Sequence, residues 1–79
     1  MTNIPTELLR TLVAVVDFGS VIKAAHSLGA TEPSVSAKIE RLETLLGADL
    51  LDKSASSATL TATGKLVVSY ARRLLSLGD

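Results

Sequence analysis

The sequence of 79 residues contains no cysteine and a single histidine, His26. Without cysteine the chain can form neither disulfides nor thiolate zinc sites, and one histidine outside a cluster of ligands does not make a metal site. Aromatic residues account for only 3% of the chain, which argues against a surface that stacks bases or sugars. We therefore expect no cofactor and no metal.

The chain also lacks a surplus of either charge, because eight Lys and Arg residues balance eight Asp and Glu residues. Domains that bind nucleic acids usually carry a basic surplus, so this balance counts against that function. The most apolar stretch, residues 8–16, is too short to span a bilayer, and no basic leader precedes it. These absences predict a cytoplasmic protein without a membrane partner.

Apolar residues make up 47% of the chain, and most are Leu, Val, Ile and Ala, which suits packed helices. Their spacing predicts a first helix over residues 6–18, with Gly19 as its stop. Ser20 is placed to cap a short second helix that ends at Gly29. The residues expected to face inward from this second helix are Ile22, Ala25 and Leu28.

A third helix is predicted to begin after Thr31, which can cap it. Glu32 and Pro33 then occupy the first turn, where the missing amide hydrogen of proline costs nothing. The helix should continue to Gly47, with an inward stripe at a 4-3-4 spacing made of Val35, Ile39, Leu42 and Leu46.

The periodicity changes after this helix. Residues 50–60 predict a weak, short hairpin, and Thr61 can cap a final helix. An apolar stripe on this final helix is wide enough either to pack on the first helix or to pair with a partner's helix, and it suggests both. Its members are Leu66, Tyr70, Leu74 and Leu77, widened by Val67, Ala71 and Leu75.

Three residues follow the logic of a helix-turn-helix. A small residue, Ala25, allows close approach of two helices, Gly29 makes the turn, and the branched Val35 anchors the next helix. The same spacing occurs in any pair of antiparallel helices, so by itself it leaves DNA binding and a plain structural hairpin equally open. No set of residues provides an acid–base pair or an activated nucleophile, so we do not expect an enzyme.

Longer blocks extend this pattern along nearly the whole chain. They are residues 8–16, Gly19-Ser20 with Ala24-Ala25, residues 31–36, residues 39–43 with Leu46-Gly47, and Leu60-Thr61 with Gly64. In this order and spacing they resemble the N-terminal DNA-binding domains of LysR-type transcriptional regulators.

The resemblance implies a mainly α, winged helix-turn-helix fold, with residues 1–61 as the DNA-binding domain and 62–79 as the start of a dimerising linker helix. It implies sequence-specific DNA binding in bacterial transcription regulation as a homodimer, with a tetramer as a further option for full-length regulators. Residues 31–46 would enter the major groove and residues 50–60 would contact the backbone. A small-molecule effector would act through a C-terminal domain that this chain does not include.

The site residues expected on this basis fall into two groups. The DNA-binding group is Ser20, Thr31, Glu32, Pro33, Ser34, Ser36, Ala37, Lys38, Arg41 and Lys53. The dimer-interface group is Leu66, Val67, Tyr70, Leu74 and Leu77.

Two departures from the family pattern keep an alternative open. Glu32 stands where the family usually has Gln, and it can accept from a cytosine amino group or simply complement the helix dipole. Residues 54–59 carry no charge, and Lys53 alone stands where a family Arg would. The alternative is a protein-interaction module of the same fold that has weakened or lost DNA binding.

Overall fold

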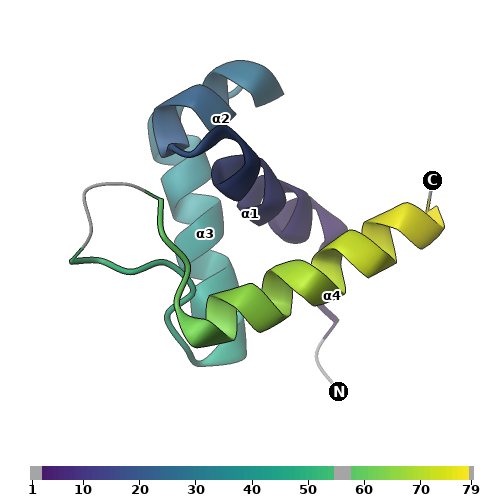
Figure 1. The fold of residues 1–79 in the computed structure, drawn as a ribbon. Helices are drawn as coiled ribbons and strands as arrows, with labels where there is room; N and C mark the ends of the chain where they lie inside the picture. Colours follow the sequence, from purple (N-terminus) through teal and green to yellow (C-terminus); the bar gives the residue numbers. More distant parts are fainter. Residues whose placement is uncertain (1–2, 55–57, 79) are drawn as a thin grey trace.

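The computed structural model describes the backbone of residues 3–54 and 58–78 and the side chains as far as residue 76. These residues form four helices (Figure 1): α1 (Thr6–Phe18), α2 (Val21–Leu28), α3 (Glu32–Leu46) and α4 (Ala62–Gly78). Helix α1 is the centre of the fold, because it packs against each of the other three, and α2 also packs against α3. All four helices lie where the sequence predicted them.

Glycine ends each of the first three helices in the left-handed conformation. Gly19, Gly29 and Gly47 have φ values of 77°, 65° and 68°. The left-handed region is open to glycine because it has no Cβ to collide with the following carbonyl oxygen. The stop signals predicted at these three positions are therefore confirmed.

The core lies between α1 and the helices around it. Leu9, Leu12 and Val15 of α1 are fully buried, as are Val35 and Leu42 of α3. Leu50, which follows α3, is also fully buried and brings the start of the next segment into the same core. The inward stripe predicted for α3 is confirmed, with Ile39 buried and Leu46 partly buried against the cluster.

The inward face predicted for α2 is largely wrong. Ile22 is 65% exposed and Leu28 is 45% exposed, whereas Ala24 and Ala25 are buried. Steps of three residues fall short of the 3.6-residue turn, so Ile22 and Leu28 lie on opposite flanks of Ala25. The small side chains of the alanine pair are what α2 presents to its neighbours, which permits close packing.

Helix α4 has two apolar faces, and the structure gives them different surroundings. Val68 and Ala71 are buried in the core on the side of α1, and Val67 packs partly against it. Leu66 and Tyr70 lie on the other side and are 74% and 54% exposed. The predicted stripe is therefore mostly outward, while Val68, which the sequence analysis did not single out, joins the core. The side chain of Leu77 lies outside the described residues.

The segment between α3 and α4 is the predicted hairpin, but regular strands do not form in its described part. One antiparallel bridge joins Leu51 to Leu60. The amide of Asp52 donates to the Thr59 carbonyl at 2.7 Å, and the amide of Thr61 donates to the Leu50 carbonyl at 3.0 Å. We call this paired part, residues 50–52 and 59–61, the wing base; residues 55–57 at the expected tip lie outside the described residues.

The described part of the chain offers neither a membrane span nor a metal-binding cluster. No helix there is long and apolar enough to cross a membrane. The same residues contain no group of three or more His, Cys, Asp or Glu side chains that could hold a metal ion.

Candidate nucleic-acid interface

Side-chain caps set the geometry of the α2–turn–α3 unit. The Ser20 hydroxyl accepts from the amide of Lys23 at 3.0 Å, and the Thr31 hydroxyl accepts from the amide of Ser34 at 3.2 Å. Between the helices, the amide of Ala30 donates to the Ala25 carbonyl at 2.9 Å and closes the turn. Both predicted caps are confirmed, and they begin the two helices at defined residues.

The caps also limit how many free amides α3 offers to an anion. Pro33 has no amide hydrogen, Ser34 donates to the Thr31 hydroxyl, and Val35 donates to the Thr31 carbonyl. Of the first-turn donors, these bonds leave the amide of Glu32, whose own carboxylate is close in the chain. The helix dipole still favours an anion here, but the start of α3 offers few free amides to hold a phosphate.

The outward face of α3 carries most of the residues predicted to read DNA. Glu32, Pro33, Ala37 and Arg41 are exposed, and Ser34 and Ser36 are half-buried beside them. Glu40 is exposed as well, so this helix face presents acidic as well as basic side chains. The structure brings these side chains together on a single surface; what they contact stays a prediction.

Lys38 lies at the margin of this surface and is already paired. Its ammonium Nζ lies 2.6 Å from Oε1 of Glu7 on α1, and its side chain is about one-third exposed. The hydrogen bond from Lys38 lowers the pKa of Glu7 below its ordinary value. Arg41, one turn further along α3, takes part in none of the ion pairs found between described residues.

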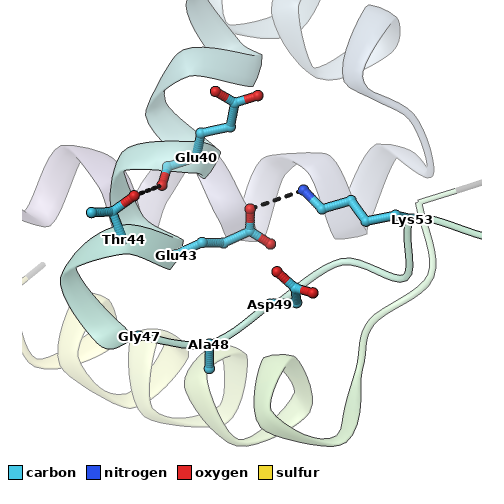
Figure 2. A pocket seen from close by; sticks show the side chains of 7 residues that line it. All are labelled: Glu40, Glu43, Thr44, Gly47, Ala48, Asp49 and Lys53. Atoms are coloured by element: carbon cyan, nitrogen blue, oxygen red, sulfur yellow. Dashed lines mark hydrogen bonds and ion pairs between the residues drawn. The ribbon is translucent and has the colours of Figure 1, made fainter.

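A buried carboxylate at the end of α3 is the feature that sequence reasoning missed. Glu43 Oε2 accepts from the amide of Leu50 at 2.8 Å and, more distantly, from that of Leu51 at 3.5 Å. Its other oxygen, Oε1, accepts from Nζ of Lys53 at 3.0 Å (Figure 2). Burial raises the pKa of Glu43, but the bonds from Leu50 and Lys53 outweigh it and the pKa is lowered. A glutamate at an inward helical position followed by a lysine ten residues later is a signal, although a weak one.

The other side of the wing base is tied to α4. The Thr61 hydroxyl accepts from the amide of Gly64 at 3.0 Å, which confirms the predicted cap, and donates to the Asp49 carbonyl at 2.7 Å. Gly64 lies against the wing base so closely that an added Cβ would collide with the Leu50 carbonyl oxygen. The wing base is thus held between α3 and α4 by single side chains and one close backbone contact.

On α4 the exposed apolar residues form one continuous stripe. Leu66, Tyr70 and Leu74 follow one another at intervals of four residues, and a shallow groove runs along them beside Ser69 and Arg73. Arg72 points elsewhere and pairs with Asp17 of α1, with 2.6 Å between Nη2 and Oδ1. Helix α4 carries Lys65, Arg72 and Arg73 and no acidic residue, so part of its positive charge is neutralised by α1.

Comparison with known proteins identifies the family. The model of the bacterial regulatory helix-turn-helix proteins of the lysR family matches residues 6–65. The chain belongs to the LysR family. Within this family it is 44% identical over 79 residues to a probable RuBisCO transcriptional regulator of Cyanidioschyzon merolae, covering 98% of the chain and 26% of that relative. It is 42% identical over 71 residues to the SDS degradation transcriptional activation protein of a Pseudomonas species, covering 90% of the chain and 23% of that protein.

Solved structures of LysR-type domains share the fold. A domain named BenM_DBD, in complex with catB site 1 DNA, matches with a TM-score of 0.92 at 37% identity over 96% of this chain and 84% of that one. The CbnR_DBD–DNA complex matches with a TM-score of 0.89 at 32% identity over 95% of this chain and 86% of that one. The predicted winged helix-turn-helix fold is confirmed. The family to which the chain belongs is one of transcription regulators and not of enzymes. The chain spans about a quarter of the length of the curated relatives above.

Proposed function

We propose that this LysR-type domain binds double-stranded DNA in a sequence-specific manner and thereby regulates transcription. The observation that carries the proposal is the exposed surface of α3, set by the Ser20 and Thr31 caps, in a fold that matches domains solved with DNA. A helix presented in this way fits the major groove, where side chains can reach base edges. Acting on a bacterial chromosome, the protein would work in the cytoplasm.

Residues on the outward face would share the work of binding. Arg41 is exposed and unpaired among described residues, so it can reach a phosphate or a guanine edge. Glu32 would accept from a cytosine amino group, and Ser36 and Ala37, which share its helix face, would meet base edges. Pro33 and Ser34 would approach the backbone at the start of α3, and Ser20 would do so at the start of α2.

The proposal includes a homodimer that forms through α4. Leu66, Tyr70 and Leu74 expose an apolar stripe that nothing in the described chain covers, while the opposite face of α4 already packs on α1. Pairing this stripe with its copy would bury it and set two α3 helices to read half-sites about one helical turn apart. The boundary between residues 61 and 62 would then separate the reading domain from the dimerising helix.

The remainder of the protein would supply regulation. The relatives are about four times longer than the match. By analogy with the family, we propose an effector-binding domain and an assembly beyond the dimer for the full-length protein. That domain, and the small molecule it binds, are proposed from the family rather than from the residues described above.

A gel-shift titration of the chain against an operator-like duplex at low and at physiological salt tests the proposal. A folded dimer should shift the duplex, with an affinity that falls as salt rises. Arg41→Met keeps the apolar stem of the side chain but removes its charge, so this variant should weaken the shift. A folded dimer that gives no shift even at low salt would rule out DNA binding.

A protein-interaction module is the second candidate, and a specific observation favours it. Three of the basic side chains form ion pairs within the fold: Lys38, Lys53 and Arg72. The chain as a whole has zero net charge. Glu32→Gln combined with basic residues at positions 55–57 separates the candidates. If the natural chain is inert and only the variant binds DNA, the interaction module is the better description.

A further inference from the structure

Lys53 is the one basic residue in the sequence of the predicted hairpin, residues 50–60, and its ammonium lies among carboxylates. Nζ lies 3.0 Å from Oε1 of Glu43, and Glu40 and Asp49 line the same hollow at the end of α3 (Figure 2). The hydrogen bond from Lys53 to Glu43 raises the pKa of Lys53, and the charges of Asp49 and Glu40 add to this effect. The positive charge is therefore balanced inside the domain.

Glu43 cannot follow Lys53 toward a ligand. Its Oε2 is bound to the amides of Leu50 and Leu51, and its side chain is only 9% exposed. If Lys53 moved to a phosphate, a nearly buried carboxylate would lose its counter-charge, which is costly. The pair between Lys38 and Glu7 differs, because the Glu7 side chain is 69% exposed and water can replace its partner.

Lys53 nevertheless lies within reach of the DNA-facing surface. It lines a small hollow with Ser36 and Glu40 of α3 and with Val21 of α2, and 59% of its side chain is exposed. Its location thus makes Lys53 a candidate phosphate contact, whereas its ion pair with Glu43 opposes that contact.

We infer that the ion pair with Glu43 keeps Lys53 away from DNA and fixes the wing base to α3. Lys53 is then a positioning residue and not a phosphate contact. The inference rests on the proposed DNA binding. It differs from the role that the sequence assigned to Lys53. It also implies that removing the negative charge of Glu43 frees Lys53 and gives the domain a phosphate contact that it lacks.

The salt dependence of DNA binding tests this inference, because the slope of log affinity against log salt changes by about 0.9 for each phosphate contact. Fluorescence anisotropy would be measured with a labelled mixed-sequence duplex long enough for two half-sites. The chains compared are the natural one, Lys53→Met, Glu43→Gln and the double variant. Asp17→Asn is the matched control, since it removes one carboxylate charge from the ion pair that joins α1 to α4 and leaves Glu43 and Lys53 unchanged.

We expect Lys53→Met to leave the slope unchanged and Glu43→Gln to steepen it by about 0.9 per chain. The double variant should return to the natural slope, and Asp17→Asn should not change it. The inference is overturned if Lys53→Met flattens the slope by about 0.9, since Lys53 would then already touch a phosphate. It is equally overturned if Glu43→Gln leaves the slope unchanged, or steepens it no more than Asp17→Asn does. No binding by the natural chain or by any variant would instead refute the proposed function.

A folding control keeps these outcomes distinct. The side-chain amide introduced by Glu43→Gln keeps a carbonyl oxygen that can accept from the amide of Leu50, so thermal unfolding should remain cooperative. Should the Glu43→Gln chain fail to fold, Lys53→Met alone still decides, because an unchanged slope supports the inference and a flattened one overturns it.

Discussion

The turn between α2 and α3 covers residues 29–31 and the connection between α3 and α4, which contains the wing base, covers residues 47–61; the two are held in different ways. The turn depends on local features, namely Gly29 in the left-handed region, the backbone bond from Ala30 to Ala25 and the cap at Thr31. The wing base has one backbone bridge and depends on contacts between residues that are separated along the chain, namely Glu43 with Leu50, Thr61 with Asp49 and Gly64 with Leu50. We therefore expect the turn to tolerate changes elsewhere in the chain and the wing base to be sensitive to the loss of a single such contact.

The largest difference should appear between two Gly→Ala substitutions. At Gly64 the new Cβ would collide with the Leu50 carbonyl oxygen and lie 3.0 Å from Leu60 Cδ2, so α4 must move away from the wing base. We expect a loss of about 3 kcal/mol in the free energy of unfolding, because the obstacle is backbone. At Gly29 there is open space and only the φ of 65° is strained, so about 1 kcal/mol is expected. Urea unfolding of both variants measures this, and equal losses would contradict the comparison.

The two threonine caps offer a closer match. Thr61→Val removes an acceptor for the Gly64 amide and a donor to the Asp49 carbonyl, whereas Thr31→Val removes only the acceptor for the Ser34 amide. We expect about 2 kcal/mol for Thr61 and about 1 kcal/mol for Thr31, measured by urea unfolding. A larger loss at Thr31 would show that the turn, and not the wing base, depends more on its cap.

Acid should loosen the wing base before the turn. The pKa of Glu43 is lower in the folded chain than its ordinary value of 4.5, so its contribution is complete above that pH and is lost as the pH falls below it. Hydrogen exchange at about pH 5 and about pH 3.5 should show the Leu50 amide losing protection more than the Ala30 amide. Glu43→Gln should reduce this pH dependence, and an unchanged dependence would show that another carboxylate is responsible.

The smallest effect is expected from an ion pair that belongs to neither connection. Arg72 and Asp17 join α4 to α1, but each side chain is 48% exposed. Exposed pairs of this kind contribute about 0.2–1 kcal/mol. Asp17→Asn should therefore lower the melting temperature only slightly, and added salt should shrink the difference between variant and natural chain. A loss as large as that of Thr61→Val would place α4 docking, rather than the wing base, among the sensitive features.

Sequence reasoning identified those parts of the fold whose causes are local. The helix boundaries, the glycine stops and the three caps follow from residues within a few positions of one another, and the structure confirms them. The α3 stripe was also predicted, because a long helix with a strict apolar spacing has one possible inner face. The candidate surface on α3 follows from that stripe by elimination.

Short or two-sided elements were harder to interpret. In α2, a helix of eight residues, too few positions exist to define a face, and close packing selected the alanine pair over Ile22 and Leu28. In α4, two apolar faces compete, and only the position of α1 decides that Val68 is buried while Leu66 is exposed.

By itself, the sequence determined where helices begin and end, because capping and left-handed glycine are properties of neighbouring residues. The tertiary structure alone decided which charges are available. Lys53 appears in the sequence as an isolated cation before a stretch without charge, yet the fold places it against Glu43, ten residues away. Electrostatic interaction depends on distance in space and on burial, and neither can be read from position along the chain.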